Sequence, residues 1–345
     1  MTVAYGGGLV KRICAMVAIA LMALGVEAAS AGSVSSSDSW AGDYGFLQLP
    51  KGTFAALDYF GYSNNGDFID TSGNHIGGRS RIWYNIARIA YVTEVAGTKV
   101  AVEAALPYAK LSGVDIGGVP QTTHGGFFSP VLFQDVGLII NPKEQRILAL
   151  TSCEYLPVGD YNNTSEINVA TPKQFVWVPQ IGYSEGLKKF GLDNFFFILV
   201  VNASLHTDGK NPFSVSPIPG LSNGVAAYSA ATQGTSYDVK AFILYQWCPL
   251  CSAAVGIEKS WGGFLTYMNG TATIPGGATF PLANEAISMD DYLRAHIQLG
   301  IPVVRDIQVA LDLHRDFARV GGFRENFGAE LRILKLFVPP VPIRR

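Results

Sequence analysis

Charged residues are scarce in this chain: they make up 15% of its 345 residues, against roughly 25% in an ordinary soluble domain. Long apolar runs are also missing, because no segment beyond residue 31 is apolar for the roughly 18 residues that a membrane-spanning helix needs. Yet 48% of the residues are hydrophobic. This composition fits either a large soluble core or an apolar surface distributed over many lipid-facing strands. The formal net charge of −2 gives no electrostatic reason to expect nucleic acid as a partner.

Residues 1–31 have the pattern of a signal peptide. Lys11 and Arg12 form a positive n-region, residues 13–26 are an uncharged apolar run too short to span a bilayer, and small residues follow at 28–31. We therefore expect residues 1–31 to be a signal peptide and the mature chain to leave the cytoplasm. A buried N-terminal helix is the alternative.

Cysteine is rare, with four residues in the whole chain. Cys14 falls in the signal peptide and Cys153 stands alone, whereas Cys248 and Cys251 form a Cys-Pro-Leu-Cys sequence. No βαβ setting or further ligand pattern accompanies this pair, so neither a redox site nor a zinc site is indicated. In an oxidising compartment the pair either closes a small disulfide or remains as two thiols.

Helical periodicity is nearly absent after residue 31, whereas alternation with period two is frequent. In 237–247 one face carries apolar residues with aromatic residues at both ends, and the other face carries Asp238, Lys240 and Gln246. Residues 293–301 and 307–314 repeat the alternation. An apolar face bounded by aromatic residues is typical of a lipid-facing strand, although a soluble sandwich also alternates.

The spacing of the candidate strands separates these two folds. Long gaps, at 63–80, 110–129, 157–173, 207–235 and 268–290, alternate with short ones. Long outer loops and short periplasmic turns are expected of an outer-membrane barrel, and a sandwich has no reason to alternate so regularly. The twelve candidate strands are 53–62, 81–94, 98–109, 130–140, 146–156, 174–185, 194–206, 236–247, 253–267, 291–301, 306–316 and 326–337.

We therefore predict an all-β fold, an antiparallel transmembrane β-barrel of about twelve strands. The barrel domain would occupy residues 32–337 and a short periplasmic tail residues 338–345. The chain would lie in the outer membrane of a Gram-negative bacterium, in contact with membrane lipid. The gap at 318–325 is intermediate in length, and the segment 211–234 is either a surface loop or a loop that folds into the entrance.

Charged and histidine residues on the polar faces are candidates for the barrel lumen. Paired across strands they would plug the lumen, and unpaired they would line a water-filled pore; a twelve-stranded interior favours the plug. His296 and His314 fall on neighbouring strands and either fill space or form a constriction that orients a polar substituent. The lumen candidates are Arg88, Glu103, Asp238, Lys240, Glu258, Arg294, His296, Asp312, His314, Glu330 and Arg332.

The motifs of common enzyme classes are missing. The sequence has no Gly-x-Ser-x-Gly elbow, no His-Glu-x-x-His and no phosphate-binding glycine loop. None of the five histidines has a helical two-ligand spacing or a cysteine partner. We expect no catalytic residues, no cofactor and no metal, and we expect that the protein is not an enzyme.

Three segments contain short recognisable motifs: Leu49–Thr53, Ala105–Tyr108 and Tyr155–Tyr161, of which the Leu-Pro-x-Gly-Asp-Tyr part of the third is the most specific. They resemble recurring motifs of the phenol meta-pathway degradation (MetA-pathway) family of outer-membrane transporters. The resemblance extends over about residues 45–337. It implies a monomeric twelve-stranded barrel with a narrow channel for hydrophobic or aromatic molecules, and it carries no catalytic residues.

One departure concerns the end of the chain. Barrels of this type usually end at an aromatic residue that the outer-membrane assembly machinery reads, whereas Phe337 is followed by eight more residues and Lys335 interrupts the apolar face.

Our leading hypothesis is passive uptake of small hydrophobic or aromatic molecules. The alternatives are a non-transporting structural or partner-binding barrel and a secreted sandwich.

Overall fold

The computed structural model describes most of the chain after residue 39. The described residues are 40–41, 47–141, 146–165, 167–170, 172–215, 225–248, 250–273, 279–288, 291–304 and 306–339. The predicted signal peptide and most of the predicted periplasmic tail lie outside them. No helix in this described part is long and apolar enough to cross a membrane.

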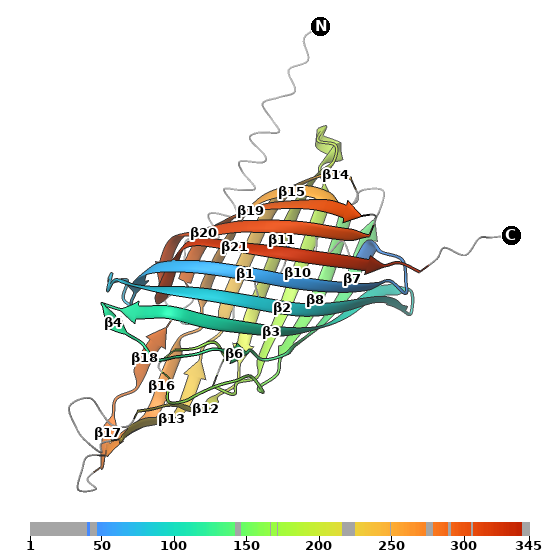
Figure 1. Cartoon of the computed structure of the whole chain (residues 1–345). Helices are drawn as coiled ribbons and strands as arrows, with labels where there is room; N and C mark the ends of the chain where they lie inside the picture. The colour runs from blue at the N-terminus through green and yellow to red at the C-terminus, as the bar shows by residue number, and fades with distance from the viewer. Residues whose placement is uncertain are drawn as a thin grey trace, which may run out of the picture.

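Twelve long antiparallel strands of the described chain form a closed barrel. Each pairs with its sequence neighbours in the ring, and the first strand pairs with the last, from Phe54 opposite Phe337 to Ile69 opposite Gly322. Figure 1 shows the first and last strands, β1 and β21, side by side. The strands are β1 (Phe54–Ile69), β2 (Gly78–Val95), β3 (Thr98–Ile116), β7 (Val131–Asn141), β8 (Arg146–Tyr155), β10 (Val176–Gly186), β11 (Phe195–His206), β14 (Ser236–Cys248), β15 (Cys251–Gly262), β19 (Asp291–Val304), β20 (Ile307–Val320) and β21 (Gly322–Phe337).

Alternating side chains give the barrel wall an apolar outside and a largely polar inside. On β19, Ile297 is 61% exposed whereas its neighbours His296 and Gln298 are buried. On β14 the aromatic residues Tyr237 and Trp247 are exposed near the two ends of the strand. The wall therefore has the apolar belt with aromatic borders that a lipid-embedded barrel needs, and the predicted transmembrane barrel is confirmed.

The connections at the two rims differ in length. Tight turns such as Ala96–Gly97, and a segment holding the short 3-10 helix η2 (Lys188–Phe190), join strands at one rim, which we call the short-turn rim. At the opposite, long-loop rim, four small strands lie between the barrel strands. They are β4 (Val119–Pro120), β5 (Thr123–His124), β6 (Gly126–Phe127) and β9 (Ile167–Asn168).

A second sheet projects from the long-loop rim (Figure 1). Tyr228 and Tyr267 pack against each other in it, with ring centroids 5.6 Å apart. The predicted loops at 207–235 and 268–290 are thus partly strands. The sheet consists of β12 (Gly209–Val215), β13 (Val225–Gln233), β16 (Leu265–Thr273), β17 (Thr279–Leu282) and β18 (Glu285–Ser288).

Several predicted boundaries are wrong: β1 and β3 each extend seven residues beyond their predicted ends at 62 and 109, and glycine explains two further errors. The predicted strand 253–267 ends at Gly262, because Gly262 and Gly263 have φ values of 98° and 78° and turn the chain into the second sheet. The predicted gap at 318–325 shrinks to Gly321, whose φ of 75° lets β20 and β21 meet in a one-residue turn.

Candidate functional site

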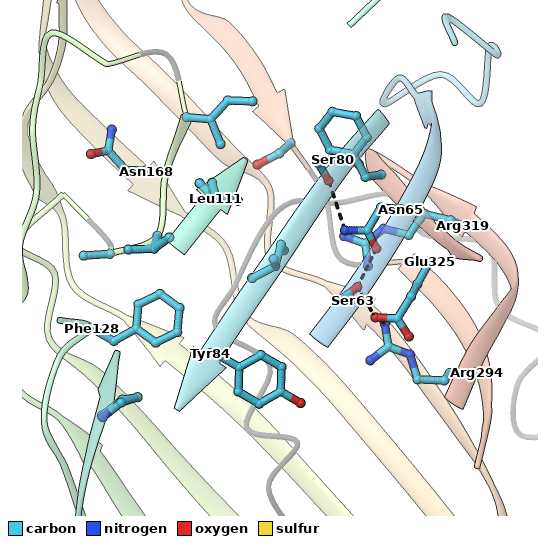
Figure 2. Close-up of a pocket in the computed structure, with 18 of the residues that line it drawn as sticks. Ser63, Asn65, Ser80, Tyr84, Leu111, Phe128, Asn168, Arg294, Arg319 and Glu325 are labelled. Carbon is cyan, nitrogen blue, oxygen red and sulfur yellow. Dashed lines mark hydrogen bonds and ion pairs between the residues drawn. The ribbon is translucent and has the colours of Figure 1, made fainter. Parts of the chain in front are cut away.

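A cavity of about 800 Å³ lies inside the barrel toward the long-loop rim. One side is lined by apolar and aromatic side chains, among them Tyr84, Leu111 and Phe128, and the opposite side by charged ones (Figure 2). Loop and second-sheet residues, including Ile167 and Tyr267, complete the lining on the long-loop side. The cavity lining therefore has an apolar part and a polar part, and both face the inside of the barrel.

Trp40 and Ala41, which precede β1, lie inside the barrel, and Trp40 borders this cavity. The Trp40 indole Nε1 donates a hydrogen bond of 2.7 Å to Glu330 Oε1, and the Arg332 guanidinium lies 4.5 Å from the Trp40 ring centroid. The backbone N–H of Ala41 donates to Gln298 Oε1 at 3.1 Å. The partners of this segment are side chains on the inner face of β19 and β21, so Trp40 is docked in the lumen rather than on the rim.

Toward the short-turn rim the lumen is filled by packed apolar side chains. Leu47, which is 1% exposed, belongs to one buried cluster with Trp40 and the inward residues Leu57, Val92 and Leu336. Lys99 Nζ also donates to the Leu49 carbonyl at 2.9 Å. We call the described residues 40–41 and 47–50 the lumen segment, and this packing closes the short-turn end of the barrel.

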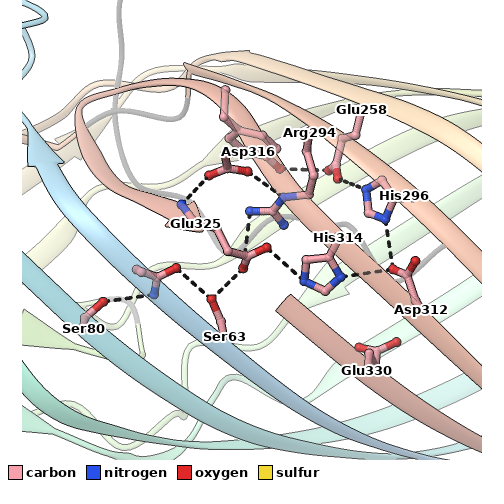
Figure 3. A network of polar contacts seen from close by, with 12 residues as sticks. Ser63, Ser80, Glu258, Arg294, His296, Asp312, His314, Asp316, Glu325 and Glu330 are labelled. Carbon is pink, nitrogen blue, oxygen red and sulfur yellow. Dashed lines mark hydrogen bonds and ion pairs between the residues drawn. The ribbon is translucent and has the colours of Figure 1, made fainter. Parts of the chain in front are cut away.

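All eleven lumen candidates point inward, and nine of them lie on the adjacent strands β14, β15, β19, β20 and β21. Seven line the cavity: Lys240, Glu258, Arg294, His296, Asp312, His314 and Glu330. Lys240 lies 3.6 Å from Glu258, and Arg294 Nε donates to Asp316 at 2.8 Å. Figure 3 shows most of these groups in one continuous network across the wall. Asp238 and Arg332 are buried beside it and bond Asn202 and Gln308.

The remaining two candidates form a separate pair on β2 and β3. Arg88 Nε donates to Glu103 at 2.6 Å, and both side chains are buried. The guanidinium also contacts the Tyr59 hydroxyl at 3.2 Å and lies 4.7 Å from the Phe133 ring centroid. This pair links β2 to β3, and neither of its residues lines the cavity.

The sequence prediction missed several residues of the polar wall. Glu325 and Asp316 are buried members of the network, but the predicted gap hid Glu325 and the predicted strand ended at Asp316. Their alternation with Arg294 and His314 across β19 to β21 was the available signal. Trp40 was missed because no strand pattern surrounds it.

The three family-like motifs surround the cavity and its closed end. The first contains Gly52, whose φ of 88° and N–H bond to the Val92 carbonyl turn the chain into β1. In the second, Pro107 lies two residues after Ala105, the last β3 residue that pairs with β7, and its carbonyl accepts from Phe128 N at 2.9 Å. The loop before β7 thus covers the wall where β3 loses its strand partner.

The third motif closes the same gap from the other side. A side chain at Gly159 would place a Cβ 2.9 Å from Ser129 N, so only glycine fits there. Asp160 accepts a 2.9 Å bond from Phe127 N, and the Tyr161 hydroxyl donates to the Pro212 carbonyl. Burial raises the pKa of Tyr161, whose hydroxyl lines the cavity.

Cys248 and Cys251 are joined by a disulfide across the turn between β14 and β15 at the short-turn rim, and Cys153 is a buried thiol on the inner face of β8.

A family model confirms the predicted resemblance for part of the chain, whereas the resemblance was expected over about residues 45–337. The family model for the MetA-pathway of phenol degradation matches residues 61–212. This match covers the second and third motifs, β2 to β11 and much of the cavity lining. No curated protein matches the sequence.

One solved structure supports the fold. The chain is similar to a crystal structure of an outer membrane channel from Pseudomonas putida F1, with a TM-score of 0.67 and 20% sequence identity over 88% of this chain and 100% of that one. The toluene transporter TodX of P. putida matches more distantly, with a TM-score of 0.33 and 10% identity over 86% of this chain and 92% of that one. The similarity to the P. putida F1 channel covers the whole of that chain, so it supports a complete barrel as the fold of this chain.

Proposed function

We propose that this protein is an outer-membrane channel through which small hydrophobic molecules, including aromatic ones, pass passively. One observation carries the proposal. The barrel has an apolar outer surface and encloses a cavity that is lined on one side by apolar and aromatic residues. An apolar cavity of about 150 Å³ is enough to hold benzene, so 800 Å³ accommodates a monoaromatic molecule with room to move. The family match, and the similarity to an outer membrane channel, point in the same direction.

The proposal includes the cellular setting. Residues 1–31 would direct export, residues 32–337 would be folded by the outer-membrane assembly machinery of a Gram-negative bacterium, and residues 338–345 would form a periplasmic tail. The barrel would act as a monomer whose main partner is membrane lipid. We assign it no chemical reaction.

The polar wall gives the channel a means of orienting its solute. Tyr84 and Phe128 form an aromatic surface, Arg294 lies across the cavity from them (Figure 2), and His314 belongs to the polar part of the lining. An aromatic ring can stack on the first surface while a hydroxyl or carboxylate substituent meets the second. The channel would thus favour amphipathic aromatics over plain alkanes.

The packed lumen segment implies that the structure is a closed state. Flux requires Trp40 and Leu47 to leave the positions in which Glu330 and the apolar cluster hold them. This same packing is the observation that favours the second candidate function, a non-transporting barrel whose loops serve a structural or binding role.

Uptake by proteoliposomes distinguishes the two. Vesicles that contain the full mature chain are mixed with radiolabelled phenol or toluene, and accumulation is compared with that in empty vesicles. The Leu111→Trp variant fills the cavity from β3, whereas Leu106→Trp places the same side chain on the lipid-facing side of the same strand, where Leu106 is 44% exposed.

A channel predicts uptake above empty vesicles, a loss of it in Leu111→Trp and retention in Leu106→Trp. Uptake equal to that of empty vesicles, with a correctly folded barrel on a heat-modifiability gel, would support the non-transporting barrel. Equal effects of the two variants would show that the solute does not pass through this cavity.

A further inference from the structure

Two histidines meet directly across the pairing of β19 and β20. His296 and His314 are register partners, so their side chains project from the same place on the inner wall. Their ring centroids lie 5.5 Å apart. Asp312, two residues before His314 and therefore on the same face, lies 2.9 Å from His296 Nδ1 and 3.2 Å from His314 Nδ1. One potential ligand atom from each of the three residues lies within 4.8 Å of the other two.

Each imidazole also contacts a second carboxylate through its Nε2 atom. His296 Nε2 lies 3.0 Å from Glu258 Oε2, and His314 Nε2 lies 3.1 Å from Glu325 Oε1 (Figure 3). When Nε2–H donates to these carboxylates, the lone pairs of both Nδ1 atoms face the space beside Asp312. Metal-binding histidines in proteins almost always donate their other N–H to a carboxylate, carbonyl or water in this way.

The third ligand has a free oxygen. Asp312 Oδ2 contacts the two histidines, while its Oδ1 is buried and receives no hydrogen bond from any residue that the structure describes. A buried carboxylate oxygen without a donor is costly, and a bound cation would satisfy it.

The charges of the network also leave room for a divalent cation. Among the described residues, the ion pairs of the network join four carboxylates to two permanent cations, which leaves an excess of two negative charges while the histidines are neutral. The four carboxylates are Glu258, Asp312, Asp316 and Glu325, and the two cations are Lys240 and Arg294.

We propose that His296, Asp312 and His314 form a binding site for a divalent transition-metal ion such as Zn²⁺ on the inner wall of the barrel. Two nitrogen ligands and one carboxylate suit this class of ion, and the fourth position would face the cavity that the three residues line. Sequence spacing alone could not indicate the site, because only the barrel register brings residues 296 and 314 together.

Cobalt serves as a spectroscopic probe for the site. The full mature chain, purified in detergent without a histidine tag and stripped with a chelator, is titrated with Co²⁺ and then with Zn²⁺. We expect visible d–d bands of a low-symmetry Co²⁺ site at one equivalent per barrel, and their loss when Zn²⁺ displaces Co²⁺. Asp312→Asn and His314→Asn should each weaken binding by about 100-fold or more.

Two control variants separate ligation from a general effect of charge or of histidine content. Asp316→Asn removes one negative charge from the same network without touching a ligand, and His206→Asn removes a partly buried histidine on β11, away from the site. Both should bind Co²⁺ within about tenfold of wild type. The heat-modifiability gel reports whether each variant is folded. Absence of d–d bands in the folded wild-type barrel would overturn the proposal, as would equal binding by Asp312→Asn and Asp316→Asn.

Discussion

The docking of Trp40 in the lumen provides the sharpest test of how the barrel is closed. Trp40→Ala removes a hydrogen bond to the buried Glu330 carboxylate and the contact with the Arg332 guanidinium. The hydrogen bond contributes about 1–3 kcal/mol and the cation–π contact about 0.5–2 kcal/mol, and truncation of a buried tryptophan costs about 3–5 kcal/mol in all. We take about 3 kcal/mol as the free energy by which Trp40→Ala destabilises the docked lumen segment relative to the undocked one.

A change of about 3 kcal/mol shifts the equilibrium between docked and undocked lumen segment by a factor on the order of 100. The barrel wall should persist, because its strand-to-strand hydrogen bonds do not involve Trp40. Single-channel recordings in planar bilayers should therefore show that Trp40→Ala is open for a far larger fraction of time than wild type.

The matched control is Trp247→Ala, which removes a tryptophan that is 44% exposed on the outside of β14. It should leave the recordings unchanged. If Trp40→Ala conducts no more than wild type while its barrel is folded, then the lumen segment is not the element that closes the channel, and our reasoning about the closed state fails.

Three further predictions concern the wall and its loops. Arg88→Met leaves the buried Glu103 unpaired and should lower the free energy of unfolding by about 3–5 kcal/mol, whereas the double variant Arg88→Met/Glu103→Leu should recover most of it in urea titrations of vesicle-embedded protein. Ile297→Arg, midway along β19 on the lipid side, should cost about 2–4 kcal/mol in the same assay, against about 0–1 kcal/mol for Tyr237→Arg near a strand end; equal costs would place the bilayer elsewhere on the wall. Gly159→Ala should loosen the loop before β10 and speed its cleavage by protease, whereas Val158→Ala, at an exposed position, should not.

Strand positions could be predicted because each strand contacts lipid on one face and the lumen on the other. Lipid selects Val239, Ile243 and Ile297 on one face, and the lumen selects Lys240 and His296 on the other, so the period of two is visible without any tertiary information. The same reasoning failed beyond Gly262, because alternation continues into the second sheet and only the backbone of Gly262 and Gly263 marks the change of sheet.

The cavity and its closure were less accessible. That the charged residues would point inward could be predicted from their faces, but which of them contact one another depends on strand register across the ring, as for His296 and His314. The role of Trp40 depends on Glu330 and Arg332, almost 300 residues later in the chain, and nothing near Trp40 in the sequence indicates those partners.

The pairing of the first and last strands sets an order of assembly. Trp40 precedes β1, and the groups that hold it, Glu330 and Arg332, belong to β21. Until β21 is in place the indole lacks both of these partners, so its docking comes after the last strand has formed. The chain has five tryptophans. In a variant that keeps Trp40 as its only tryptophan, fluorescence would report when β21 is in place and would distinguish an unfinished barrel from a finished one.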